Sequence, residues 1–187
     1  MTSPTPAAPR PWLTRANLLT AVRLALAPVL VCAVLAPAPV LAALVFALAV
    51  GTDLLDGPVA RRFGETSPLG GFLDHATDAT FVSLGLAACA WTGEIPFLLP
   101  GLVVFAFVQY TLDSRVLAGE HLRASALGRY NGIAYFVALG VPVIRDALGL
   151  AVPASVWVQG FGWLLVATTL VSMLDRGWAL WARRRSS

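Results

Sequence analysis

Residues 40–60 read VLAALVFALAVGTDLLDGPVA, an apolar run that ends with two carboxylates, Asp53 and Asp56. A stretch of about 20 predominantly apolar residues has the length of a helix that crosses the hydrocarbon core of a bilayer. An acidic side chain at the centre of such a helix costs about 2.5–3.5 kcal/mol on insertion scales. The stretch therefore predicts a membrane-spanning helix whose two acids must be offset by a positive charge.

Apolar sequence of this kind extends over nearly the whole chain. Of its 187 residues, 58% are hydrophobic and 12% are charged, about half the charged fraction of a typical soluble domain. Short polar or proline-bearing breaks divide it into six predicted spans, at about residues 18–36, 40–60, 70–91, 96–113, 128–145 and 154–174. We expect an all-α bundle of six transmembrane helices in one domain, residues 12–176, between a disordered tail at 1–11 and a basic tail at 177–187.

The arginines predict how this bundle is oriented. All thirteen basic residues are arginines, and with a cytoplasmic amino terminus twelve of them lie on the cytoplasmic side and Arg145 lies outside. Because positive residues accumulate on the cytoplasmic side of membrane proteins, we expect both termini in the cytoplasm and the protein in the inner (plasma) membrane. The net charge of +3 then indicates membrane lipids as a partner, and no nucleic acid.

A second pair of carboxylates follows in the next span. Residues 61–78 read RRFGETSPLGGFLDHATD, in which Asp74 and Asp78 are four residues apart and share one face of a helix. Asp53 and Asp56, three residues apart, do the same. The short connection predicts that the two helices are antiparallel neighbours, with the four carboxylates facing one another.

These four carboxylates need a counter-charge in lipid. Arg61 and Arg62 could neutralise two of them, but these arginines lie at the helix end and also orient the helix. A cation site is the more economical answer, and oxygen ligands on two helices suit Mg²⁺ or Mn²⁺ better than Zn²⁺, which favours His or Cys. His75 points about 100° away from Asp74 on the helix, so we expect it to pack or hydrogen-bond rather than to bind metal.

The segment from Asp53 to Asp78 resembles the signature of the CDP-alcohol phosphatidyltransferases, D-x-x-D-G-x-x-A-R-x8-G-x-x-x-D-x-x-x-D. Its fixed positions are all filled, by Asp53, Asp56, Gly57, Ala60, Arg61, Gly70, Asp74 and Asp78. The resemblance implies a transferase of substituted phosphate groups that is a homodimer and binds two divalent ions per active site through Asp53, Asp56 and Asp74. It also implies that Asp78 is a further metal ligand and the general base. The residues that it places at the CDP-linked donor are Gly57, Ala60, Arg61, Ser67 and Gly70.

The stretch from Asn17 to Pro28 is similar to N-x-L-T-x-x-R-x-x-x-x-P, found at the start of many bacterial members of this family. The similarity places Asn17 and Thr20 at the donor, and Arg23 at the donor phosphates or at the carboxylates of the metal site. The alternative is an ordinary helix start, in which Asn17 is the cap and Arg23 extends to the membrane interface.

The acceptor alcohol is expected at the cytoplasmic ends of the fourth and fifth spans. Arg115, Arg123 and Arg129 lie there and suit a phosphorylated acceptor, although cytoplasmic loops commonly contain such arginines. Family members that use CDP-diacylglycerol produce a phospholipid and CMP. We expect glycerol 3-phosphate as the acceptor, with inositol phosphate or serine as the alternatives.

Two functions from other classes compete with this enzyme. A divalent-cation transporter would need polar residues through the depth of the bundle, but the acids cluster in one half of two helices. A scaffold without catalytic activity is disfavoured because no carboxylate of the signature is missing. The sequence therefore favours a phospholipid-synthesis enzyme.

Overall fold

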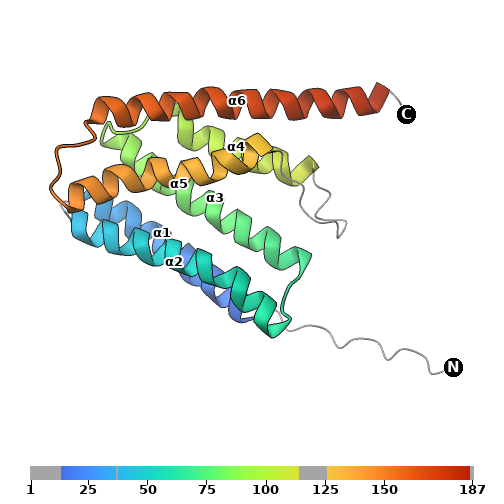
Figure 1. Ribbon diagram of the computed structural model, residues 1–187, viewed down its shortest axis with the longest axis horizontal. Coiled ribbons are helices and arrows are strands. Elements are labelled where there is room, and N and C mark those ends of the chain that lie inside the picture. Colours follow the sequence, from blue (N-terminus) through green and yellow to red (C-terminus); the bar gives the residue numbers. More distant parts are fainter. Residues whose placement is uncertain (1–13, 37, 114–125, 186–187) are drawn as a thin grey trace.

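The computed structural model describes residues 14–36, 38–113 and 126–185, and all regular structure within these ranges is helical. The helices are α1 (Arg15–Leu35), α2 (Pro39–Phe63), α3 (Pro68–Trp91), α4 (Leu98–Asp113), α5 (Ala126–Ala147) and α6 (Ser155–Arg185). They run back and forth, so that the beginning of α1 and the end of α6 lie toward the same end of the bundle (Figure 1). The predicted all-α bundle of six helices is confirmed, with boundaries within a few residues except at the end of α6.

Within the described residues, four helices are long and apolar enough to cross a membrane, over Asn17–Leu35, Pro39–Phe63, Leu127–Ala147 and Ser155–Trp178. Helix α4 contributes a shorter apolar segment, Leu98–Thr111. Helix α3 has 24 residues, but Asp74, His75 and Asp78 lower the hydropathy of its first half. Helix α6 continues past residue 176 to Arg185, so the predicted domain boundary at 176 falls inside a helix.

The pattern of buried residues in α2 explains why its acids face the inside of the bundle. One face of the helix is buried at intervals of mostly three or four residues, by Ala42, Val45, Phe46, Ala49, Thr52 and Asp56. Leu41, Leu44 and Leu48 on the remaining surface are exposed, as expected for side chains in contact with lipid. The packing that buries Phe46 therefore also directs Asp56 inward.

Helix α1 packs against both α2 and α3. Its start is capped by Thr14, whose side chain accepts a hydrogen bond from the backbone N–H of Asn17 at 3.0 Å. The backbone N–H of Arg15 donates to the Glu65 carboxylate at 2.9 Å, and the Arg15 guanidinium lies 3.8 Å from the centre of the Phe63 ring. These contacts fix the beginning of α1 beside the turn that joins α2 to α3.

That turn is short because both helix ends are capped. Gly64 ends α2 in the left-handed region, at φ 65°, which favours glycine. The Ser67 hydroxyl accepts a hydrogen bond from the backbone N–H of Gly70 at 3.0 Å and caps α3. Beyond the turn, however, α2 and α3 diverge (Figure 1), and α1 packs against both of them more extensively than they pack against each other. The two helices are antiparallel and joined by a short turn, as predicted, and each makes its most extensive helix contacts with α1.

The opposite end of the bundle is held by Arg145, near the end of α5. Its guanidinium lies 2.9 Å from Glu94 and 2.7 Å from Asp146, and it also donates to the carbonyl of Pro153 at 3.2 Å. The hydroxyl of Ser155 donates to Glu94 at 2.7 Å. Arg145 therefore joins the α3–α4 connection, α5 and the α5–α6 connection.

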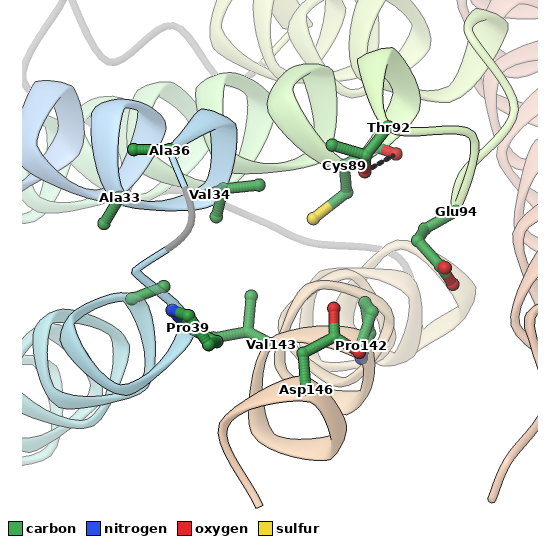
Figure 2. A pocket seen from close by; sticks show the side chains of 11 residues that line it. Ala33, Val34, Ala36, Pro39, Cys89, Thr92, Glu94, Pro142, Val143 and Asp146 are labelled. Carbon is green, nitrogen blue, oxygen red and sulfur yellow. Dashed lines mark hydrogen bonds between the residues drawn. The ribbon is translucent and has the colours of Figure 1, made fainter. Parts of the chain in front are cut away.

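A small cavity of about 260 Å³ lies beside this end (Figure 2). Side chains from four helices line it, among them Val34 of α1, Pro39 of α2, Cys89 of α3 and Val143 of α5. Most of its lining is apolar, and the carboxylates of Glu94 and Asp146 that reach it already contact Arg145. The cavity is thus separate from the four aspartates, which lie at the other ends of α1, α2 and α3.

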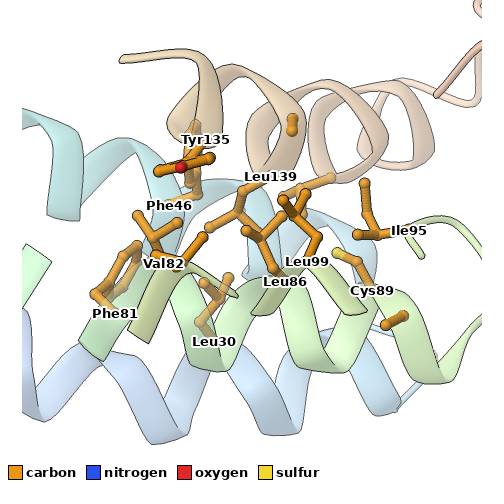
Figure 3. Packing of buried hydrophobic residues seen from close by; sticks show 14 of the residues in the cluster. Leu30, Phe46, Phe81, Val82, Leu86, Cys89, Ile95, Leu99, Tyr135 and Leu139 are labelled. Carbon is orange, nitrogen blue, oxygen red and sulfur yellow. The ribbon is translucent and has the colours of Figure 1, made fainter. Parts of the chain in front are cut away.

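A close-packed apolar core separates the two ends (Figure 3). Its fully buried members include Leu30, Phe81, Leu86, Leu99 and Leu139. Two glycines let helices approach closely: a Cβ at Gly85 would lie 2.7 Å from Leu139, and one at Gly140 would lie 2.7 Å from the Phe46 ring. Because such a core resists deformation, it gives the aspartates a rigid support.

Candidate active site

The four aspartates meet at the end of the bundle where α1 begins. Asp53 and Asp56 come from α2, and Asp74 and Asp78 come from α3. Single carboxylate oxygens of Asp53, Asp56 and Asp74 all lie within 4.8 Å of one another, and ligand atoms of Asp74, His75 and Asp78 satisfy the same limit. The predicted convergence of the two carboxylate pairs is therefore confirmed.

The guanidinium of Arg23 lies among these carboxylates. Its Nη1 atom is 3.1 Å from Asp53 Oδ1 and 3.0 Å from Asp74 Oδ1, and it also donates to Asp78. Its Nη2 atom donates to Asp56 Oδ2 at 2.5 Å. One fully buried guanidinium thus contacts all four carboxylates. The sequence similarity places Arg23 at the donor phosphates or at the carboxylates of the metal site, and in the structure it lies at the carboxylates.

The other alternative, an ordinary helix start, is wrong on both points. Thr14 rather than Asn17 is the cap of α1, and Arg23 turns into the bundle instead of extending to the interface. Arg61 and Arg62, the counter-charges that the sequence suggests first, are exposed. Arg23 was the better candidate for the counter-charge of the aspartates, because a charged side chain within an apolar helix needs a partner of opposite charge.

The composition of the cluster fits divalent cations. Four carboxylates against one guanidinium leave three negative charges without compensation among these five side chains. The side chains of Asp53, Asp74 and Asp78 are 31%, 25% and 21% exposed, so ions can reach them from solvent. Carboxylate oxygens are the ligands that Mg²⁺ and Mn²⁺ prefer.

Three residues that the sequence places at the donor lie together beside the cluster. A Cβ at Gly70 would lie 3.1 Å from Ser67 Oγ and 3.6 Å from Asn17 Oδ1. Thr20, one helical turn after Asn17, is buried and lies between Asn17 and Arg23 along α1. The beginning of α1 and the α2–α3 turn thus present small and polar groups near the carboxylates.

The remaining donor candidates lie on the last turns of α2. A Cβ at Gly57 would lie 3.4 Å from Nη1 of Arg61, so the arginine side chain folds back along the helix over the glycine. Ala60 is partly buried on the same segment. Their role in donor binding stays a prediction.

A cavity of about 520 Å³ opens beside Asp53 and Asp78. Arg129 of α5 and Arg176 of α6 also line it, and the Arg176 guanidinium lies 5.0 Å from the centre of the Tyr110 ring. Asn131 lines it as well, and it is 5% exposed with no hydrogen-bond partner for its Nδ2 group among the described residues. The cavity therefore combines carboxylates, positive charge and an amide donor.

Of the three arginines predicted to bind the acceptor, Arg129 lines this cavity near the aspartates. Arg115 and Arg123 fall outside the described residues. The sequence missed Arg176 and Asn131 as site residues. Arg176 fits the positive-inside pattern without any further role, and no spacing pattern marks Asn131.

His75 also lines this cavity, with its Nδ1 atom 3.8 Å from Asp74 Oδ2 and its ring 6.1 Å from the Tyr110 ring. It is therefore closer to the carboxylates than the prediction from its helical position implies. No ion-binding role follows from this contact alone.

Comparisons with known proteins agree with this geometry. The family model described as CDP-alcohol phosphatidyltransferase matches residues 13–182. The chain is 35% identical over 173 residues to a CDP-diacylglycerol--glycerol-3-phosphate 3-phosphatidyltransferase of Pseudomonas fluorescens, covering 88% of this chain and 89% of the relative. It is 30% identical over 168 residues to a probable phosphatidylglycerophosphate synthase of Mycobacterium tuberculosis, covering 86% and 80%.

An archaetidylinositol phosphate synthase of Aeropyrum pernix is 31% identical over 136 residues, covering 68% of this chain and 66% of the relative. The printed names of these relatives thus differ in the product. Taken with the four long apolar helices of the described residues and the converging aspartates, these matches show that the chain is a multi-pass membrane transferase of the CDP-alcohol phosphatidyltransferase family.

Proposed function

We propose that this chain transfers the phosphatidyl group of CDP-diacylglycerol to glycerol 3-phosphate and releases CMP. The observation that carries the proposal is the cavity that Asp53 and Asp78 line together with Arg129 and Arg176. It joins carboxylates, which suit metal and proton chemistry, to two cations that suit a phosphate. The names of the relatives from P. fluorescens and M. tuberculosis support glycerol 3-phosphate as the acceptor.

Two Mg²⁺ or Mn²⁺ ions are part of this proposal. The family is generally dependent on divalent metal, and the carboxylates of Asp53, Asp56 and Asp74 lie close enough together to hold a metal ion, as do those of Asp74 and Asp78 beside His75. Asp53, Asp56 and Asp74 would hold the ions, and Asp78 would complete the ligand set. Bound metal supplies the positive charge that neutralises the donor pyrophosphate and the departing CMP.

Asp78 is assigned as the general base. Its carboxylate lines the cavity and accepts the proton of the acceptor hydroxyl as that oxygen attacks the phosphorus that carries diacylglycerol. The bond between this phosphorus and the bridging pyrophosphate oxygen breaks, and CMP leaves with the electron pair. The protonated Asp78 then returns its proton to solvent through the open side of the cavity.

Donor binding is assigned to the residues near the beginning of α1 and the α2–α3 turn. Their small side chains let a nucleotide approach the backbone, and their polar groups can donate to phosphate or ribose oxygens. The set is Asn17, Thr20, Gly57, Ala60, Arg61, Ser67 and Gly70. The close grouping of Asn17, Ser67 and Gly70 supports this assignment.

Acceptor binding is assigned to Arg129 and Arg176, which would hold the phosphate, and to Asn131, which would donate to an acceptor oxygen. Arginine pairs favour phosphorylated acceptors over serine. Inositol phosphate is the second candidate, because the relative from A. pernix is named an archaetidylinositol phosphate synthase.

The site is assigned to the cytoplasmic face of the inner membrane. The asymmetry of the arginines supports this orientation, because the carboxylate end of the bundle carries Arg61, Arg62, Arg129 and Arg176. The homodimer that the family resemblance implies is part of the proposal, and light scattering of the detergent-solubilised protein gives the mass that tests it.

An acceptor panel tests the proposal. Purified protein in detergent is incubated with CDP-diacylglycerol and Mg²⁺, and with glycerol 3-phosphate, inositol phosphate, serine or phosphatidylglycerol in separate reactions. We expect CMP release with glycerol 3-phosphate and a lipid product that retains its phosphate. Faster release with inositol phosphate would replace the acceptor and keep the enzyme, whereas no release with any acceptor would reject both.

A further inference from the structure

We infer that Arg23 is a tethered counter-ion, which holds the four carboxylates in the metal-free protein and which divalent metal has to displace. This inference rests on the metal site proposed above. It states that Arg23 and the metal ions bind the same carboxylate oxygens, so that the guanidinium has to leave before metal can bind. Three observations on the described residues carry it.

The first observation is that the guanidinium uses the oxygens that a metal would use. Nη1 contacts Asp53, Asp74 and Asp78, and Nη2 contacts Asp56, at distances that reach 3.1 Å at most. A magnesium ion would need such oxygens at about 2.0–2.1 Å. Since Nη1 already fills the space between three carboxylates, an ion cannot take these positions while Arg23 stays.

The second observation is the charge of the cluster. Four ionised carboxylates match the charge of two divalent ions, whereas Arg23 compensates only one of the four. The carboxylates therefore gain far more compensation from two ions than they lose with the guanidinium. The charge balance favours exchange of the arginine for metal.

The third observation is that Arg23 is incompletely satisfied where it lies. Its Nε group is buried and has no hydrogen-bond partner among the described residues. An unsatisfied buried donor of a charged group is costly, so this position is less favourable than that of a fully paired structural arginine. The guanidinium is held by attraction to the carboxylates and loses little else when it leaves.

The role of such a counter-ion is to let the bundle assemble before metal is bound. Without Arg23, four carboxylates at this spacing would repel one another in a medium of low polarity. The arginine keeps the four carboxylates together until metal replaces it. Metal binding is then an exchange of cations rather than a step that the fold itself requires.

Mn²⁺ binding to the detergent-solubilised protein, measured by titration calorimetry, tests this inference. The wild type is compared with Arg23→Gln and with Arg62→Gln, a control whose guanidinium is exposed and lies 5.9 Å from the Phe63 ring centre. Because Arg23→Gln removes a competing charge next to the ions, we expect it to bind Mn²⁺ tighter by about tenfold or more. Arg62→Gln should bind as the wild type does.

A second readout is the dependence of thermal stability on metal. All proteins are purified with Mg²⁺, and the unfolding midpoint is measured before and after addition of a chelator. Removal of metal should lower the unfolding midpoint of Arg23→Gln strongly and that of the wild type little, because only in the wild type can the Arg23 guanidinium neutralise the carboxylates in place of the metal. Readdition of Mg²⁺ should restore Arg23→Gln.

The outcomes are distinguishable. A wild type that binds no Mn²⁺ would reject the metal site and the inference together. A wild type that binds Mn²⁺, with equal or weaker binding by folded Arg23→Gln, would reject the inference alone and make Arg23 a support of the ligand set.

If Arg23→Gln does not fold even with Mg²⁺, the variant Arg23→Lys decides. It keeps the charge but contacts fewer carboxylates, and it should bind Mn²⁺ more tightly than the wild type, by a smaller factor than expected for Arg23→Gln. Equal or weaker binding by Arg23→Lys would overturn the inference.

Discussion

The two ends of the bundle each hold a buried arginine among carboxylates, and they differ in how the charges balance. At one end Arg145 contacts Glu94 and Asp146 and also donates to a backbone carbonyl. At the other end Arg23 contacts four aspartates and keeps an unpartnered Nε within the described structure. At the first end one arginine faces two carboxylates, whereas at the second end one arginine faces four, so that the second end has the larger excess of negative charge.

The difference distinguishes an ion cluster that joins segments of the chain from the cluster that we propose as the reactive site. Arg145 joins three segments of the chain, and the cavity beside it is small and mostly apolar. The aspartates lie beside a cavity about twice as large, with Arg129 and Arg176 in its wall. The uncompensated carboxylates and their access to a polar cavity, rather than burial of charge as such, distinguish the end at which we propose the active site.

Loss of the proposed general base should have the largest effect. We expect Asp78→Asn to reduce CMP release about 10²- to 10⁴-fold, the usual range for a general base, while some Mn²⁺ binding remains through the other three aspartates. Asp175→Asn, on the exposed surface of α6, is the matched control and should keep wild-type turnover. An active Asp78→Asn enzyme would remove the base from Asp78.

The opposite end should respond in stability and not in chemistry. Arg145→Met leaves Glu94 and Asp146 without their cation, and we expect a loss of about 2 kcal/mol, between the values for exposed and fully buried ion pairs. The unfolding midpoint in detergent measures this loss. CMP release per folded molecule should stay within about twofold of the wild type, and a selective loss of turnover would contradict the structural role of this end.

The acceptor side should show a smaller effect that is specific to one substrate. Loss of a hydrogen bond to a charged group costs about 1.5–3 kcal/mol, so Arg129→Gln should raise the KM for glycerol 3-phosphate about tenfold or more. The KM for CDP-diacylglycerol should change little, and steady-state kinetics with each substrate varied in turn measures both. Equal increases for donor and acceptor would place Arg129 outside the acceptor site.

Acid should produce the smallest effect, at Glu94. Burial favours the neutral form of this carboxyl, but hydrogen bonds from Arg145 and Ser155 outweigh burial and hold the pKa of Glu94 below its ordinary value. The stabilisation is therefore complete above the ordinary glutamate pKa of about 4.3 and is lost as pH falls through the lower folded value. The unfolding midpoint of the wild type should drop more steeply with acid than that of Glu94→Gln, and parallel profiles would contradict this.

Much of this fold follows from local sequence. Apolar length predicts the six helices, and the three- and four-residue spacing of the aspartates predicts their common faces, because both depend only on helix geometry. The end of α6 is missed because Asp175, Arg176 and Gly177 interrupt the apolar stretch, although the alanines, leucine and arginines that follow continue a helix readily. Hydropathy marks the membrane segment and not the helix end.

The parts of the site that sequence leaves open depend on packing between distant helices. Nothing within residues 17–28 tells that α1 packs against both α2 and α3, so Arg23 could be assigned to the donor phosphates, to the carboxylates or to the interface. Arg176 is harder still, because the positive-inside pattern already accounts for it. Only the arrangement of α3 to α6 around one cavity brings Arg176 and Asn131 to Asp78.

The metal dependence of CMP release tests the central claim, that the aspartate cluster is a metal-dependent transfer site. Purified wild-type protein with CDP-diacylglycerol and glycerol 3-phosphate is stripped with a chelator and then titrated with Mg²⁺ or Mn²⁺. We expect no release without metal, saturable release with it, and no metal response in Asp53→Asn or Asp74→Asn over the same range. Undiminished release in the presence of chelator would contradict the account.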